Sequence, residues 1–180
     1  MEVLRAYKTE VDPNNAQRTA LLKHAGVARF AYNWGLAKRK QEYEETGKSS
    51  NAIEQHRQLN VLKKTDFPWL YEVSKCAPQE ALRDLDKAYQ NFFRHVKNGE
   101  KPGFPRFKSR KNGIGSFRLT GAVHVAETRI KLPRIGWLKL KERGYIPTDG
   151  IHVLSATVSE SAGRWFVSVQ CKQEIEVTQA

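Results

Sequence analysis

Residues 75–118 read KCAPQEALRDLDKAYQNFFRHVKNGEKPGFPRFKSRKNGIGSFR, and this stretch organises the rest of the chain. Its first half predicts a helix, because Ser74 can cap the start and Pro78 falls in the first turn, where a missing backbone N–H costs little. The Asn98-Gly99 pair and the two prolines that follow rule out a longer helix. The stretch therefore predicts a helix that continues into a loop.

The predicted helix has two different sides. Large apolar residues recur at helical spacing and predict a side for burial; they are Leu82, Leu85, Tyr89, Phe92, Phe93 and Val96. A second stripe contains only cations and amides; its members are Lys75, Gln79, Arg83, Lys87, Gln90, Arg94 and Lys97. A charged stripe is usually a solvated face, but such faces mix signs, so this one favours contact with nucleic acid.

The loop after the helix alternates cations with aromatic residues. Its cations are Lys101, Arg106, Lys108, Arg110 and Lys111. Cations neutralise phosphates and aromatic rings stack on bases, so the combination favours nucleic acid. A turn that feeds a strand would instead place Phe104 and Phe107 in the core. We expect both features together, with the phenylalanines buried and the cations exposed.

Composition predicts a polyanionic partner. The 180 residues contain 31 Lys and Arg against 19 Asp and Glu, a formal charge of +12, and nucleic acid is the usual partner of such a chain. No apolar run approaches the roughly 20 residues of a membrane span, and the start lacks a signal-peptide core, so we expect an intracellular protein. Cys76 and Cys171 lie far apart without a paired motif, which indicates neither a disulfide framework nor a zinc site.

Three helical segments are expected ahead of the central helix, within residues 12–64. Cap residues at 12–15 begin a short helix up to Gly26, and a second helix covers 27–46 and stops at Gly47. Two helices hinged at a glycine predict a helix-turn-helix-like start over 12–47, with a plain αα-hairpin as the alternative. In the second helix we expect the cations outside; they are Arg29, Lys38, Arg39 and Lys40. Asn51 and Glu54 predict a third helix start.

Beyond Gly115 the pattern changes to period two, which is typical of strands. The predicted strands are residues 116–120, 123–125, 129–132, 137–141, 152–159 and 164–172, with a hairpin turn at 161–163. Residues 3–11 read as another strand, which most simply joins the same sheet. The expected fold is therefore α+β: a small antiparallel β-barrel formed by residues 1–11 and 101–180, with a helical insertion over 12–100.

Catalytic motifs are not evident. The five histidines are scattered, and no metal-binding spacing or phosphate loop occurs. The acids of the predicted barrel sit at turns rather than at the paired strand positions of a two-metal nuclease; they are Glu127, Glu142, Asp149 and Glu160. We therefore expect no active site, no bound cofactor and no small-molecule substrate in this chain.

Several motifs in order carry a resemblance to a known family. They are residues 14–17, 27–33, 69–73, 88–93, 103–107 (GFPRF) and 130–137 (IKLPRIGW). With these motifs the chain resembles the N-terminal half of TnpB, the OrfB-type protein of bacterial insertion sequences that is ancestral to type V CRISPR effectors. The resemblance implies a wedge β-barrel interrupted by a helical recognition domain, a guide RNA, and a short target-adjacent DNA motif.

The resemblance also places cutting outside this chain. In the family a RuvC-like nuclease domain with a magnesium site follows, whereas this sequence stops near where that domain's first strand should begin. The resemblance therefore implies RNA and duplex DNA binding without cleavage, with a separate nuclease half as a candidate partner, at the nucleoid in a prokaryotic cytoplasm. Two alternatives stay open: a DNA-only helix-turn-helix regulator that uses residues 29–40, and a decayed transposase fragment without a role.

Two residues are the candidates for reading DNA bases. Lys75 and Gln79 are four apart at the helix N-terminus; lysine donates to guanine or thymine, and glutamine can pair with adenine through two hydrogen bonds. The resemblance to TnpB implies that these same two positions contact the target-adjacent DNA motif. The alternative is that both are solvated, or that Gln79 simply caps a neighbouring turn. The remaining cations are expected to hold phosphates; they are Arg83, Lys87, Arg94, Lys97, Lys101, Arg106, Lys108, Arg110 and Lys111.

Overall fold

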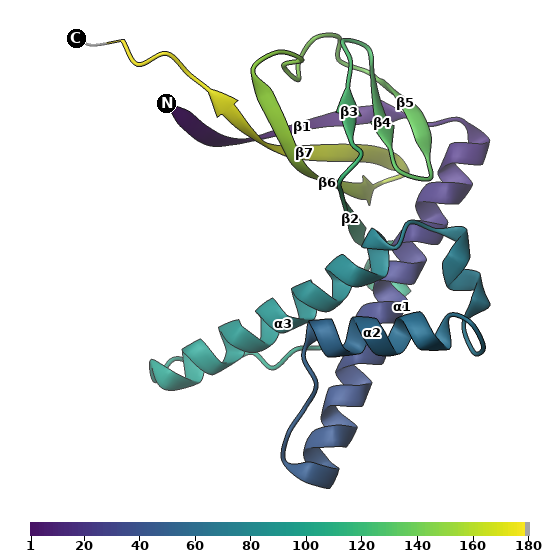
Figure 1. Cartoon of the computed structure of the whole chain (residues 1–180), viewed down its shortest axis with the longest axis vertical. Helices are drawn as coiled ribbons and strands as arrows, with labels where there is room; N and C mark the ends of the chain where they lie inside the picture. The colour runs from purple at the N-terminus through teal and green to yellow at the C-terminus, as the bar shows by residue number, and fades with distance from the viewer. Residues whose placement is uncertain (179–180) are drawn as a thin grey trace.

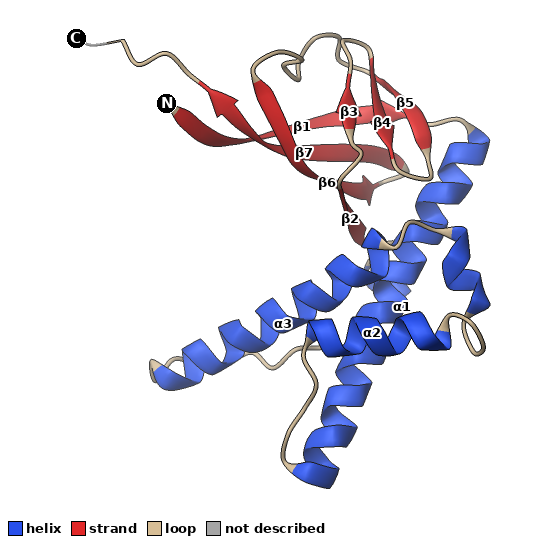
Figure 2. Cartoon of the chain, in the orientation of Figure 1, coloured by secondary structure: helices blue, strands red, loops and turns tan. Residues whose placement is uncertain are grey.

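A computed structural model describes residues 1–178 and has the expected α+β architecture (Figures 1 and 2). The helices are α1 (Asn15–Thr46), α2 (Ala52–Leu62) and α3 (Cys76–Lys97), with short 3₁₀ helices η1 (Pro68–Glu72) and η2 (Arg110–Asn112). The strands are β1 (Glu2–Asp12), β2 (Ser116–Thr120), β3 (His124–Val125), β4 (Arg129–Leu132), β5 (Gly136–Leu140), β6 (Ile151–Ser161) and β7 (Arg164–Glu174). Every predicted strand is present, with ends that differ by at most two residues.

The strands form one antiparallel sheet in the order β2-β6-β7-β1-β5-β4-β3. The first strand joins this sheet as predicted, because β1 pairs with β7 on one side and with β5 on the other. Within residues 1–178, β2 and β3 each pair with a single neighbour, so the expected barrel is not closed. The two-residue strand β3 offers too short a ladder to complete the ring.

The β6–β7 hairpin turns at the predicted place. Ala162 and Gly163 have φ angles of 52° and 78°, and Ser161 pairs with Arg164 across the turn. Positive φ at both central residues is the backbone of the hairpin turn that matches strand twist, and glycine adopts it without steric cost.

Helix α1 corrects the prediction of two helices hinged at Gly26. It runs without a break from Asn15 to Thr46. The Asn14 side chain accepts a hydrogen bond from the backbone N–H of Gln17, and the Gln17 side chain accepts one from the backbone N–H of Asn14. Gly47 ends the helix at φ 73°. A glycine inside a helix costs only about 1 kcal/mol relative to alanine, and the packing of α1 on its neighbours outweighs that. Residues 12–47 therefore contain no turn between helices.

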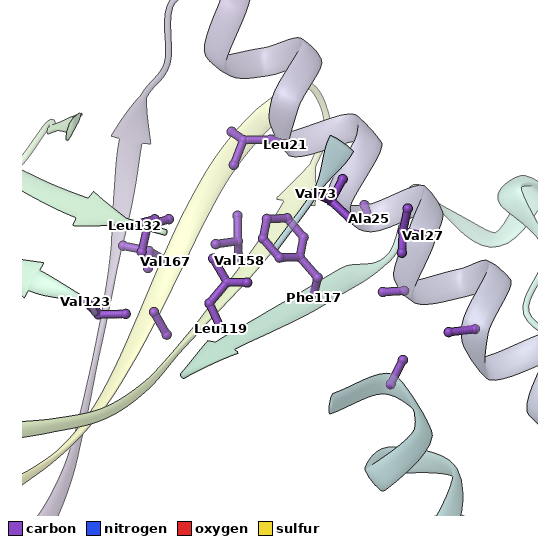
Figure 3. Packing of buried hydrophobic residues seen from close by; sticks show 14 of the residues in the cluster. Leu21, Ala25, Val27, Val73, Phe117, Leu119, Val123, Leu132, Val158 and Val167 are labelled. Carbon is purple, nitrogen blue, oxygen red and sulfur yellow. The ribbon is translucent and has the colours of Figure 1, made fainter. Parts of the chain in front are cut away.

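One core connects the helices to the sheet. Figure 3 shows Leu21, Ala25 and Val27 of α1 beside Phe117 and Leu119 of β2, with the β-strand residues Val158 and Val167 beyond them. Deeper in the helical layer, Leu36, Leu82 and Leu85 are completely buried.

Two further expectations concern membranes and cysteines. None of the helices in residues 1–178 is long and apolar enough to cross a membrane. Cys76 and Cys171 both carry free thiols.

Candidate nucleic-acid interface

The predicted base-reading residues lie at the N-terminal end of α3. Lys75 is the N-cap residue and is exposed, while Gln79, one turn later, is half-buried. Ser74 stabilises the start of the helix, because its hydroxyl accepts a hydrogen bond from the backbone N–H of Cys76 at 3.3 Å. The Lys75 side chain therefore remains available at a helix end whose dipole favours negative charge.

A pocket between α2 and α3 adds residues that sequence reasoning missed. Its volume is about 250 Å³, and it is lined by Ala52, Ile53, His56, Arg57, Gln79 and Arg83. Burial lowers the pKa of His56, and the nearby cations Lys63, Arg83 and Lys75 lower it further. His56 is therefore neutral near pH 7 and offers a hydrogen bond rather than a charge. No sequence motif marks His56 or Arg57; only the packing of α2 across α3 brings them beside Gln79.

Arg83, one of the predicted phosphate contacts, is already paired. Its guanidinium donates to the carboxylate of buried Glu80 at 2.9 Å. The other oxygen of Glu80 accepts from Arg118 of β2 at 2.9 Å, and Arg118 also reaches Asp84 at 2.6 Å. This network links α3 to the sheet.

The expectation that Phe104 and Phe107 are buried is wrong. Their exposed fractions are 43% and 50%. Both rings instead lie beside the Lys40 amine, which is 5.4 Å from the Phe104 centroid and 4.7 Å from the Phe107 centroid. Buried Pro105 sits between them. A cation above an aromatic face stabilises a ring that stays partly in water, so these residues satisfy their contacts without entering the core.

The loop is held against α1 by Asn33. Its side-chain amide donates to the backbone carbonyl of Lys108 at 2.8 Å and accepts from the Lys108 N–H at 2.7 Å. The Lys108 amine lies 4.3 Å from the centre of the Tyr32 ring. A two-way amide clamp of this kind mimics a strand pair and fixes the position of the backbone.

A second basic pocket follows from this arrangement. It has a volume of about 330 Å³ between α1 and the loop, and its lining includes Arg29, Arg106, Phe107 and Lys108. Arg29 also donates to the carbonyl of Ile114 at 3.0 Å. Arg94 and Lys97 are not part of this pocket, and they lie in the last turn of α3. The predicted phosphate contacts therefore fall into at least two groups. Lys87, Lys101, Arg110 and Lys111 are exposed but line neither pocket.

Arg39 corrects the expectation that the cations of α1 stay outside. Only 6% of its surface is exposed, and it forms an ion pair with Asp86 of α3. Its guanidinium also stacks 4.8 Å from the centre of the Tyr89 ring. A buried arginine needs a partner, and the partner is a carboxylate far along the sequence. Arg39 therefore cannot serve as a recognition-helix cation.

The apolar stripe of α3 is buried along only part of its length. Leu82 and Leu85 are completely buried, Tyr89 and Phe92 are half-buried, and Phe93 is 61% exposed. Val96, at 51% exposed, is likewise uncovered. The prediction that the whole stripe packs inward is thus wrong for Phe93 and Val96, which stay more than half exposed, whereas the loop residue Phe104 packs on Phe92.

Three of the four acids considered for catalysis have other partners. Glu127 binds Arg143 at 2.9 Å, Glu142 accepts from the Thr9 hydroxyl at 2.8 Å, and Glu160 accepts from the Gly163 N–H at 2.5 Å. Across residues 1–178 the structure contains no group of three or more His, Cys, Asp or Glu residues placed to hold a metal ion.

Comparison with known proteins identifies relatives over most of the chain. Residues 1–48, which form β1 and α1, match the helix-turn-helix domain of OrfB from IS605. InsQ of Escherichia coli, named as an RNA-guided DNA endonuclease, is 32% identical over 97% of this chain and 42% of its own length. A Streptomyces pristinaespiralis protein of the same description is 32% identical over 97% of this chain and 43% of its own.

A shorter relative aligns over nearly its whole length. VsdF of Salmonella dublin, described as a virulence protein, is 31% identical over 62% of this chain and 97% of its own length. The chain thus spans less than half the length of the two endonuclease relatives, and most of the length of VsdF is matched within it.

Proposed function

We propose that this chain, which belongs to the OrfB family of IS605-type insertion sequences and corresponds to the N-terminal half of its longer members, forms a nucleic-acid-binding unit. In this proposal it holds a guide RNA and reads a short motif in duplex DNA beside the target. Relatives named as RNA-guided DNA endonucleases support this reading.

The exposed cations around the loop at residues 101–111 support this function most directly. Lys101, Arg106 and Lys108 are exposed on one short segment, and Arg29 lines the same pocket as Arg106. Phosphate neutralisation by such residues releases counterions and supplies much of the affinity for nucleic acid. If about eight phosphates are contacted, log K should fall against log salt with a slope of about −0.7 to −0.9 per contact. A slope typical of one or two contacts would contradict an extended interface.

Lys75 and Gln79 are proposed to read the DNA motif. They sit at the start of α3, beside the pocket that holds His56 and Arg57. Replacing either residue by alanine should weaken binding to the preferred duplex by about 1–3 kcal/mol and leave non-specific affinity nearly unchanged. The preferred duplex would be selected from a randomised library.

The matched control is Lys87→Ala, which removes an exposed cation two turns further along the same stripe. It should weaken all duplexes equally. An equal loss of affinity for all sequences in Lys75→Ala and Gln79→Ala would indicate that these residues contact phosphates. No loss of affinity would indicate that they lie on a solvated face.

The RNA part of the proposal has its own test. Sequencing the nucleic acid that co-purifies with the chain should recover one structured RNA from a single locus. Absence of RNA together with specific DNA binding would favour a DNA-only regulator. That alternative is weakened by α1, because Arg39 is buried against Asp86 and Arg29 donates to the Ile114 carbonyl. A chain that binds no nucleic acid would match the decayed fragment.

Cutting is proposed to come from a magnesium-binding nuclease half outside these residues. The acids of the sheet support this, because Glu127, Glu142 and Glu160 are already engaged in hydrogen bonds or ion pairs. The purified chain should show no magnesium-dependent cleavage of RNA or DNA, and addition of a separate nuclease half should restore it. Cleavage that depended on the chain's own Asp or Glu residues would overturn this assignment.

A further inference from the structure

An aromatic cleft opens between the C-terminal ends of α1 and α3. It has a volume of about 340 Å³, and its apolar walls are the rings of Tyr43, Tyr89, Phe92, Phe93 and Phe104. Neither the base-reading pair nor the basic pocket of the loop is part of it. Tyr43 is 67% exposed and Phe93 is 61% exposed. So much aromatic surface in contact with water is costly unless something covers it.

The rings are arranged as a preformed platform. Phe104 meets Tyr89 and Phe92 edge to face, with centroids 5.6 and 5.2 Å apart. Phe93 meets Phe92 in the same way at 5.4 Å. Buried Arg39, which is paired with Asp86, stacks its guanidinium on Tyr89 and lines the cleft. Contacts between the rings hold them in place without a ligand, and this lowers the entropic cost of binding.

The rim carries two kinds of polar group. The cation is Lys40, whose amine lies 5.4 Å from the centre of the Phe104 ring. Glu44 and Ser49 line the same cleft and supply acceptor oxygens. Cations beside aromatic faces are the combination that binds a single strand, with the phosphates on the cations and the base on the rings.

We propose that the aromatic cleft binds one unpaired nucleotide of single-stranded RNA, with its base stacked on the rings and its ribose hydroxyl donating to Glu44 or Ser49. The proposal rests on the nucleic-acid-binding function above and adds to it a specific site. An unpaired base enters such a cleft without the cost of leaving a duplex. Glu44 distinguishes the sugars, because a carboxylate repels phosphate but accepts from a 2′-hydroxyl that DNA lacks.

The test compares short fluorescent oligouridine with oligodeoxyuridine of the same length, two probes that differ only in the 2′-hydroxyl. The intact chain should bind the RNA probe more tightly, and Phe93→Leu should weaken that binding about tenfold, since it removes a stacking ring but keeps an apolar side chain. The salt slope should stay unchanged, because no phosphate contact is lost. Val96→Ala is the control, an exposed apolar residue of the same helix outside the cleft.

A second variant tests the sugar contact. Glu44→Gln should reduce the preference for RNA over DNA while stacking on the rings persists. Unchanged affinity in Phe93→Leu would overturn the cleft, and equal binding of the RNA and DNA probes would overturn the assignment to RNA. An equal loss on duplex DNA in Phe93→Leu would also overturn it, by showing a general defect. Failure of the unmodified chain to bind any nucleic acid would instead contradict the function proposed above.

Discussion

The two ends of α3 lie in different surroundings although one sequence period runs through both. Leu82 and Leu85 near the start are fully buried, whereas Phe93 and Val96 near the end are more than half exposed. Periodicity reports which residues share a side of a helix, but not whether another element covers that side. Burial at the start comes from α1 and β2, and towards its end α3 diverges from α1 (Figure 1).

The charges of the two ends differ in the same way. The first half carries Glu80, Asp84 and Asp86, all engaged with arginines. The last ten residues, 88–97, contain no acid. The start of α3 is therefore fixed to the rest of the fold by ion pairs, and the end presents uncompensated cations and rings. The predictions that follow test this difference.

The largest difference should appear when apolar side chains are truncated. Leu82→Ala leaves a cavity in a fully buried site, so it should lower the free energy of unfolding by about 2–5 kcal/mol. Val96→Ala on the exposed end should change it by less than about 0.5 kcal/mol. Urea denaturation of the two variants provides the measurement. Similar losses would mean that the end of the helix is covered in solution.

Removal of the ion-pair link should have a smaller effect. Arg118→Ala leaves buried Glu80 without its partner on β2, which should cost about 1–3 kcal/mol. Arg143→Ala is the matched control, because its pair with Glu127 is exposed on both sides, and exposed pairs contribute about 0–1 kcal/mol. Thermal unfolding of both variants separates the two cases. A loss of stability in Arg118→Ala no larger than that of the control would show that this ion pair does not fix the start of α3.

Acid should weaken the fixed end through His24. Its imidazole is buried, accepts from the Ser74 N–H at 3.0 Å and contacts the Ala20 carbonyl at 2.7 Å. Burial lowers the pKa of His24, and Arg134 lowers it further. The contribution to stability is therefore complete above about pH 6.5, the unfolded value, and is lost as pH falls below it.

One proton limits the slope of this loss to about 1.4 kcal/mol per pH unit. The measurement is the free energy of unfolding of the unmodified chain and of His24→Gln across that range. His24→Gln should have a flatter profile, and His152→Gln, at an exposed position, should leave the profile unchanged. Parallel profiles for all three proteins would exclude His24 as the source.

The smallest effect on stability is expected at the exposed end. The double variant Arg94→Ala with Lys97→Ala should leave the free energy of unfolding within about 0.5 kcal/mol. If both residues hold phosphates, the salt slope of nucleic-acid binding should become shallower by about 0.7–0.9 per contact. Binding isotherms at several salt concentrations measure the slope. An unchanged slope would make this end a solvated surface.

Local signals in the sequence were sufficient for much of the fold. Alternation located the strands, and the side chains of Asn51 and Glu54 close the predicted cap of α2. Gly26 does not interrupt α1, because a local helix-breaking signal takes no account of the packing along the whole helix. The loop phenylalanines stay exposed although their pattern predicts core residues, because a nearby cation can also stabilise an aromatic ring.

Long-range pairing explains the rest of what was missed. Arg39 and Asp86 lie 47 positions apart, and no motif near either residue indicates the pair. The pocket of His56, Arg57 and Gln79 likewise exists only after α2 and α3 meet. A single sequence marks candidate cations well, but their grouping depends on the fold.

The central position of β1 sets an order for folding. Val11 pairs with Trp165, so the first strand has no β7 partner until synthesis has passed that residue, about 8–30 s later at the usual rate of translation. The helices and the β4–β5 hairpin depend on local contacts and can form earlier. During that interval the β7-facing edge of β1 is unpaired, and exposed Arg5 and Lys8 supply the charges that discourage an edge from pairing with another nascent chain.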